Sequence, residues 1–173
     1  MHQIRSNGAL FWSVVLSLLV ALPMIAGGPT GPAGKSNVGH LSLFEKDPAT
    51  WEIIEGGAWG KMTYNLSGPE FEFVFNGHGL EAGVEYRLIY YPDPWPGTGL
   101  ICLGTATANG GGNVHIAASV DTGDLPIEAD TNQGAKIWLV LAADVTCDGV
   151  WSAWNPTEYL FEYDLITFDD TDD

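Results

Sequence analysis

The 173-residue sequence predicts an all-β protein, a single antiparallel Greek-key β-sandwich of eight or nine strands. Three observations lead to this prediction. Short segments alternate apolar and polar residues with a period of two, as strands buried on one face do. Turn-forming residues separate these segments, since the chain contains 22 glycines and 10 prolines. Beyond the N-terminal apolar run, no segment shows the apolar period of a helix.

Residues 1–26 have the pattern of a signal peptide. A basic residue, Arg5, precedes an uncharged apolar run over residues 9–26, and glycine and proline follow directly. A basic start, an apolar core and a small-residue exit characterise export signals, so we expect cleavage after Ala26 and an extracellular or cell-surface protein. The run approaches the ~20 residues that span a bilayer, so an uncleaved membrane anchor is the alternative.

The acidic composition restricts the partners. The chain has 22 acidic and six basic residues, and its formal net charge is −16. Nucleic-acid binding needs clustered lysine and arginine at the phosphates, so the sequence argues against nucleic acid. We expect a cell-envelope protein or a glycan as the partner, and membrane contact only through an uncleaved N-terminal segment.

Three segments divide the rest of the chain. Residues 27–39 are rich in glycine, proline, serine and asparagine and are expected to form a flexible linker. Residues 40–168 carry the alternating segments and are expected to form one domain of ordinary size. The acidic tail at residues 169–173 is expected to be disordered.

The first strands of the domain are expected at residues 40–46, 58–66 and 71–76. The third has the clearest pattern, because three phenylalanines alternate with polar residues, as in a strand with one buried face. These phenylalanines are predicted to enter the core.

Residues 80–91 predict a corner followed by a strand. Gly83 and Tyr86 have the spacing of a tyrosine corner, in which the phenol hydroxyl reaches back to a backbone group upstream, although Ala82 replaces the usual proline. Apolar residues then alternate, which predicts a strand buried mainly on one face. Pro92, Pro94 and Pro96 lack amide hydrogens, so we expect the strand to end in an exposed corner.

A hairpin is expected next. Strands at residues 100–108 and 114–120 flank an Asn-Gly-Gly-Gly-Asn turn, whose residues tolerate the positive φ that such turns need. Residues 135–143 are apolar on both sides of the two-residue period, apart from Lys136, which predicts a strand at the centre of its sheet. A last strand is expected at residues 159–168.

Cys102 and Cys147 are the only cysteines. An even pair in an exported chain is expected to form a disulfide, and two separate buried thiols are the alternative. No basic residue lies next to either cysteine in the sequence, so we expect neither to be a reactive thiolate.

The aromatic residues offer the main candidate for a ligand site. Trp95 in the proline corner, with Tyr90, Tyr91, Trp151 and Trp154, is a candidate for a flat platform that stacks on a sugar ring. The alternative is packing, because large aromatic side chains also cap the open end of a sandwich core.

Two further kinds of surface site have weaker patterns. Asp121, Asp124, Asp144 and Asp148 lie in predicted turns, where Ca²⁺ recruits carboxylates, but they lack the spacing of a defined calcium loop, and solvated turn residues are the alternative. Asn65 begins an Asn-Leu-Ser acceptor sequence for N-glycosylation, for which a chance match is the alternative.

No pattern predicts catalysis. His40, His78 and His115 lack the spacing of zinc ligands, and no Gly-x-Ser-x-Gly motif occurs. Glu70 and Glu72 lie on the outward side of their predicted strand, with no apolar pocket implied around them. We therefore expect no catalytic residues, and no cofactor apart from the calcium candidates.

Two segments carry a resemblance to known families. Residues 80–91 resemble the corner motif of fibronectin-III and immunoglobulin-like domains, and residues 105–114 resemble hairpins of bacterial and archaeal surface domains of that type. The span 40–168 is similar to uncharacterised secreted proteins of prokaryotes, mostly archaeal. The resemblance implies an immunoglobulin-like sandwich and export, and it implies no activity. In fibronectin-III domains the corner precedes the second-to-last strand, whereas here at least four expected strands follow it, so a different Greek-key topology is expected.

These observations favour a secreted or cell-envelope β-sandwich domain with a non-enzymatic, structural or interaction role. A carbohydrate-binding module that uses exposed tryptophan and tyrosine is the first alternative. A secreted hydrolase is the remote alternative.

Overall fold

The computed structural model describes residues 36–95 and 97–172. The expected leader and most of the expected linker lie outside these residues, as do Pro96 and Asp173. Within the described part, no helix has the length and apolar character needed to cross a membrane.

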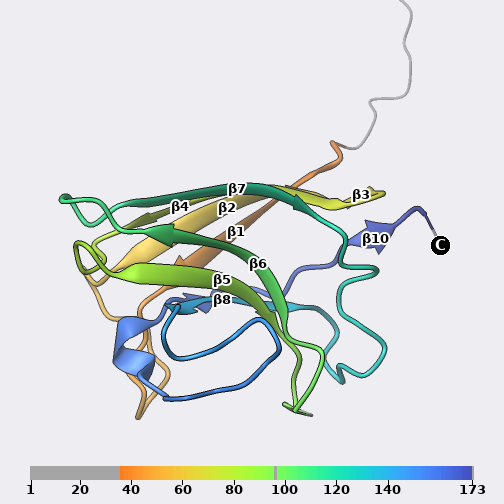
Figure 1. Cartoon of the computed structure of the whole chain (residues 1–173). Helices are drawn as coiled ribbons and strands as arrows, with labels where there is room; N and C mark the ends of the chain where they lie inside the picture. The colour runs from red at the N-terminus through yellow and green to blue at the C-terminus, as the bar shows by residue number, and fades with distance from the viewer. Residues whose placement is uncertain (1–35, 96, 173) are drawn as a thin grey trace, which may run out of the picture. The chain divides into compact units, whose positions relative to one another are not determined.

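The protein is an all-β sandwich, which confirms the predicted fold class (Figure 1). One sheet has five strands in the order β7-β4-β2-β1-β9, the other has three in the order β6-β5-β8, and neighbouring strands in both are antiparallel. A third pairing, between β10 and β3, is parallel. The strands are β1 (Val38–Phe44), β2 (Trp59–Asn65), β3 (Ser67–Gly68), β4 (Phe71–His78), β5 (Glu85–Tyr91), β6 (Ile101–Thr107), β7 (Val114–Val120), β8 (Lys136–Leu141), β9 (Phe161–Glu162) and β10 (Asp169–Asp170), and a short 3₁₀ helix, η1, spans Pro156–Glu158.

The chain connects the two main sheets in Greek-key order. It crosses from β4 to β5 in the other sheet, pairs β5 with β6, and returns with β7 to lie beside β4. The tyrosine corner lies at the first crossing and is confirmed, because the Glu81 amide donates a hydrogen bond to the Tyr86 hydroxyl at 3.1 Å. Gly83 turns the chain there with a φ of 81°, which a residue with a side chain rarely adopts.

The main core lies between the two sheets. Phe71, Phe73 and Phe75 of β4 are buried, as their alternation predicts, and they belong to one apolar cluster with Tyr86 and Leu88 of β5. Removal of this apolar surface from water is the dominant favourable contribution to folding.

A second apolar cluster covers the outer face of the three-stranded sheet. Ile89, Trp138 and Val140 belong to this cluster rather than to the main core, and they are buried against Tyr159 and Phe161. β8 is apolar on both sides for this reason, although it lies at the edge of its sheet and not at the centre as predicted. Cover of its outer face by Tyr159 and Phe161, rather than a position between two strands, accounts for its pattern.

The boundaries of the domain differ from the expected ones at both ends. β1 begins at Val38, within the expected linker, and β10 forms within the tail that was expected to be disordered. The Asp169 amide donates to the Leu66 carbonyl at 3.1 Å, and the Asp170 amide donates to the Asp124 carboxylate at 2.8 Å. The backbone amides of this tail hold it in place by hydrogen bonds. The alternation of apolar residues in a sequence does not predict such bonds.

Candidate functional site

An aromatic surface lies on the outside of the three-stranded sheet, where β5 ends. Tyr91 is the last residue of β5, and its ring stacks on Trp138 of β8 with the centroids 4.0 Å apart and the planes 14° apart. Trp95, in the proline corner, also stacks on Tyr91, at 5.3 Å and 17°. The Thr131 amide holds this corner through a hydrogen bond of 3.1 Å to the Asp93 carbonyl.

The loop at residues 142–158, here called the platform loop, completes the surface. Its two tryptophans, Trp151 and Trp154, pack edge to face with their centroids 5.6 Å apart. Trp151 lies 6.3 Å from Tyr91, and Trp154 lies 6.0 Å from Trp138. The tryptophans of the loop therefore rest on the aromatic residues of the strands.

Four of the aromatic residues named from the sequence line one open cavity. Tyr91, Trp95, Trp151 and Trp154, here called the aromatic platform, surround a volume of about 480 Å³. Trp154 remains 50% exposed, although it contacts other rings. Tyr90 does not join them, because it is fully buried in the main core and its hydroxyl donates a hydrogen bond to the Asp130 carboxylate at 2.7 Å.

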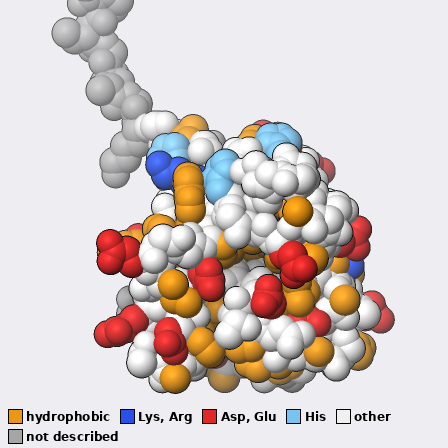
Figure 2. All heavy atoms as spheres, turned by 90° about the vertical axis from the view of Figure 1, so that its left-hand side faces the viewer, with side chains coloured by type: hydrophobic (Ala, Val, Ile, Leu, Met, Phe, Trp, Pro, Cys, Tyr) orange, Lys and Arg blue, Asp and Glu red, His pale blue; other side chains and the backbone are white. Residues whose placement is uncertain are grey.

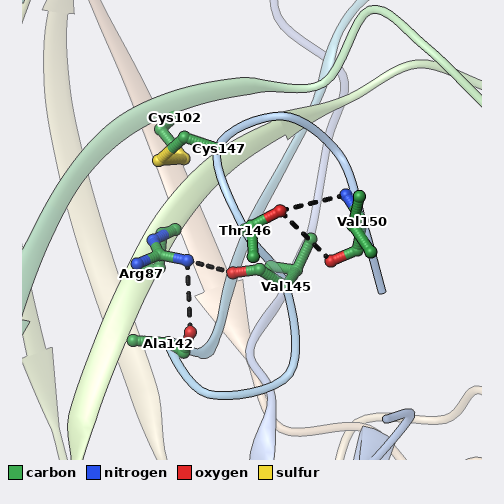
Figure 3. Close-up of a disulfide and its surroundings, with 7 residues drawn as sticks. All are labelled: Arg87, Cys102, Ala142, Val145, Thr146, Cys147 and Val150. Atoms are coloured by element: carbon green, nitrogen blue, oxygen red, sulfur yellow. Dashed lines mark hydrogen bonds between the residues drawn. A yellow bond between two sulfur atoms is a disulfide. The ribbon is translucent and has the colours of Figure 1, made fainter. Parts of the chain in front are cut away.

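A disulfide and an arginine attach the platform loop to the sheet (Figure 3). Cys147 of the loop is bonded to Cys102 of β6, with the Cα atoms 5.4 Å apart. The predicted pairing is therefore present, and the alternative of two separate thiols is wrong. The Arg87 guanidinium, from β5, donates to the carbonyl of Ala142 at 3.1 Å and to the carbonyl of Val145.

Inside the platform loop, Asp144 is a buried hydrogen-bond acceptor. Its carboxylate accepts from the Tyr159 hydroxyl, and from the Asn155 side-chain amide at 2.9 Å. The Asn155 backbone amide donates in turn to the Tyr159 hydroxyl at 3.1 Å. Burial raises the pKa of Tyr159, and the Asp144 carboxylate raises it further. These bonds give the loop a fixed shape, so its tryptophans are held in place.

A second cavity, of about 340 Å³, adjoins the aromatic platform and shares Tyr91 and Trp154 with it. It is here called the charged pocket. Its other lining residues are Lys46, Trp51, Asp93, Lys136, Trp138, Phe161 and Glu162.

The charged side chains of this pocket are held by specific partners. Lys136 forms an ion pair with Asp93, and the hydrogen bond from Lys136 holds the pKa of the Asp93 carboxyl below its usual value. The Lys46 ammonium donates to the Glu162 backbone carbonyl at 2.8 Å. Burial raises the pKa of the Glu162 carboxyl. The charge of Lys46 and the hydrogen bond from the indole N–H of Trp138 act in the opposite direction and lower it.

Apart from Tyr91 and Trp154, the residues of the charged pocket were not found from the sequence. Two of them could have been noticed in the strand at residues 136–141. Lys136 is its single charged residue, and Trp138 is a large aromatic residue on its outer side. Lys46 and Trp51 lie far away in the sequence, on the connection between β1 and β2. Nothing local to them indicates that the fold brings them beside β8.

The four aspartates considered for calcium do not form a site. In the described ranges, no group of three or more acidic, histidine or cysteine side chains is placed to hold a metal ion. Asp124 accepts the Asp170 amide and Asp144 is engaged within the platform loop, while Asp121 and Asp148 are exposed.

The glycosylation candidate has a local structural role. The Asn65 side chain donates to the Glu70 carbonyl at 2.9 Å and accepts from the Glu72 amide at 2.8 Å. The same nitrogen donates to the Ser67 carbonyl at 3.3 Å, so attachment of a glycan, which replaces one of its two hydrogens, would remove one of these two bonds. His40, His78 and His115 each bond to a different neutral side chain, and among the described residues none belongs to a group placed to hold a metal ion.

Acidic side chains gather at the end of the sandwich where the β4–β5 connection and η1 lie (Figure 2). Glu45, Glu81 and Glu158 line a cavity of about 300 Å³ there, which Tyr86 also reaches. Their field repels anions, and Figure 2 shows several acidic side chains on this face of the molecule.

Searches with protein-family models, with curated proteins and with solved structures gave no match to this chain.

Proposed function

We propose that this protein is an exported, non-enzymatic binding domain whose aromatic platform takes up a sugar ring of an extracellular or cell-surface glycan. The observation that carries the proposal is the convergence of Tyr91, Trp95, Trp151 and Trp154 on one open cavity. Flat aromatic faces stack on the apolar C–H faces of sugar rings, whereas the hydroxyl groups of the sugar remain available to polar partners.

The arrangement differs from simple capping of a sandwich core. Tyr91, Trp95 and Trp151 of the aromatic platform pack against the second cluster, on the outer face of the three-stranded sheet, and none of them belongs to the main core. A disulfide, Arg87 and the Asp144 hydrogen bonds hold the loop that carries Trp151 and Trp154. A surface that is already ordered loses less conformational entropy when a ligand binds, which favours binding.

A hydrolase is the second candidate, because the charged pocket contains two carboxylates, Asp93 and Glu162, beside the platform. Glycoside hydrolysis needs one carboxyl that stays protonated and one that stays ionised. However, Asp93 is paired with Lys136, and the Glu162 carboxylate accepts the indole N–H of Trp138. These partners occupy the groups that would have to act on a substrate, so binding is better supported than cleavage.

The test is a titration of the protein with a panel of neutral and acidic oligosaccharides. We expect binding to at least one neutral glycan, and a loss of affinity of about tenfold or more for Trp95→Ala, because the variant removes one stacking face. Trp59→Ala is the matched control: Trp59 is 41% exposed on the outer face of the other sheet and lines neither cavity, so affinity should be unchanged.

Two results would contradict the proposal. Absence of binding across the panel would leave a purely structural role as the explanation of the fold. Release of new reducing ends from a bound glycan, lost in Asp93→Asn or Glu162→Gln, would show that the protein is a hydrolase.

A further inference from the structure

The charged pocket continues the surface of the aromatic platform. The two cavities share Tyr91 and Trp154, so a ligand that stacks on the platform can extend into the pocket without leaving the protein surface. Trp138 lies beneath this junction, stacked on Tyr91 and 6.0 Å from Trp154. The floor between the two cavities is therefore aromatic.

An exposed tryptophan, Trp51, lines the charged pocket but not the aromatic platform, and its backbone conformation is unfavourable. Trp51 is 51% exposed, and its ring contacts Phe161 edge to face with the centroids 5.1 Å apart. Its φ is 61°, in the left-handed region where residues other than glycine, asparagine and aspartate are uncommon. The Asp47 carbonyl, which accepts the Trp51 amide at 2.7 Å, holds the turn. Such strain persists where the surrounding structure enforces it, and it often marks a ligand site.

The polar groups of the pocket suit an uncharged ligand that both donates and accepts hydrogen bonds. Lys46 and Lys136 are balanced by Asp93 and Glu162, so the pocket has no net formal charge. The Lys46 ammonium uses one N–H for the Glu162 carbonyl, and its other N–H groups remain donors. Sugar hydroxyl groups can accept from this ammonium and donate to the carboxylates.

The charge of the whole chain argues against an acidic ligand. The formal net charge is −16, and acidic side chains surround the hollow at one end of the molecule (Figure 2). This field would repel a uronate, and each lysine of the pocket already has an acidic residue beside it. An uncharged ring experiences no such penalty.

We propose that the aromatic platform and the charged pocket are consecutive subsites for one uncharged glycan of at least two rings, and that Trp51 and Lys46 bind the second ring. The inference rests on the proposed function, since it assigns the ligand class of the same surface.

Titration with neutral hexose and N-acetylhexosamine oligomers of one to six rings tests this inference, with oligogalacturonides as the acidic counterparts. We expect oligomers of two or more rings to bind about tenfold or more tightly than the single ring, because the second subsite adds contacts. Trp51→Ala should reduce the affinity for the oligomers to that for the single ring, and should leave the affinity for the single ring unchanged.

Trp51→Gly guards against a folding artefact, because glycine adopts the positive φ of this position without strain and the variant also lacks the ring. Both variants should give the same loss, and the control variant Trp59→Ala should give none. Neutral oligomers should bind with little dependence on salt, since no net charge is involved.

The outcomes separate the two proposals. If Trp95→Ala abolishes binding while Trp51→Ala and Trp51→Gly leave the affinity for every oligomer unchanged, the second subsite is wrong and the proposed function stands. Equal affinity for one ring and for longer oligomers, or tighter binding of oligogalacturonides, would also overturn the inference. If no glycan binds, both proposals are wrong.

Discussion

Gly112 lies where the hairpin between β6 and β7 contacts the β4–β5 connection. Its φ is 71°, and a Cβ atom at this position would lie 2.5 Å from the Leu80 carbonyl oxygen. The Leu80 amide also donates to the Gly112 carbonyl at 3.0 Å, so neither backbone can move away without loss of this bond. The requirement for glycine is therefore both conformational and steric.

We expect Gly112→Ala to reduce the free energy of unfolding by about 2 kcal/mol, from the left-handed conformation and the clash together. Gly110→Ala in the same hairpin is the matched control, because a Cβ atom there would meet nothing within 4 Å and the φ of Gly110 is not positive. Urea denaturation of both variants measures the difference. Equal stability of the two variants would show that the hairpin adjusts freely around residue 112.

Arg87 shows a different constraint on a single residue. It lies on β5 beneath the platform loop and donates to two loop carbonyls, while its buried Nε has no hydrogen-bond partner in the described residues. A buried donor without a partner costs free energy. The guanidinium at this position attaches the loop to β5, since it donates to the carbonyls of Ala142 and Val145.

The platform loop is the element on which the proposed function depends. It carries Trp151 and Trp154, and the disulfide joins it to β6 across a sequence separation of 45 residues. In the chain-entropy model, a crosslink that closes a loop of this length removes freedom from the unfolded chain worth about 4 kcal/mol.

We expect the double variant Cys102→Ala, Cys147→Ala to lose part of this stability, about 2–4 kcal/mol in urea denaturation. Glycan affinity should fall further than the fraction of folded protein does, because the loop that carries the tryptophans is no longer tied to the sheet. Comparison of tryptophan near-ultraviolet circular dichroism with the far-ultraviolet signal separates the two effects. An unchanged unfolding midpoint after reduction of the native protein would contradict the prediction.

At the scale of the whole molecule, buried tyrosines donate hydrogen bonds to aspartates of the long loops. Tyr90 extends from β5 to Asp130, and Tyr159 extends from the end of η1 to Asp144. Burial raises the pKa of both hydroxyls, and the neighbouring carboxylate raises each of them further. Burial also raises the pKa of Tyr64, Tyr86 and Tyr91.

These shifts predict alkaline unfolding. A raised pKa in the folded state means that the unfolded chain releases the phenol protons first, so stability from these groups is complete below the unfolded pKa of about 10 and falls as the pH rises above it. Urea midpoints and phenolate absorbance, measured together over about pH 8 to 11, should show that the phenol groups of these five tyrosines ionise only upon unfolding. Tyr159→Phe should make the decline shallower, and a flat midpoint over this range would exclude the mechanism.

The sequence predicts those features of the fold that depend on residues close together in the chain. Phe71, Phe73 and Phe75 mark a half-buried strand because side chains alternate within one strand, whatever surrounds it. β8 shows the limit of this argument: its two apolar sides indicate burial on both faces, but they do not reveal that Tyr159 and Phe161 cover the outer one. The last expected strand, at residues 159–168, is reduced to β9 and isolated bridges for a related reason, since burial alone does not require a continuous ladder.

The sequence by itself determined the β-sandwich, its tyrosine corner, its hairpin, its cysteine pair and the acidic balance, because each depends on neighbouring residues or on composition. Only the tertiary structure decided that Trp95 meets Trp151 and Trp154, and that Lys46 and Trp51 lie beside Asp93 and Lys136. Contacts between distant loops are set by the Greek-key crossings and by the attachment of the platform loop to the sheet. Neither the crossings nor this attachment can be predicted from the pattern of neighbouring side chains in the sequence.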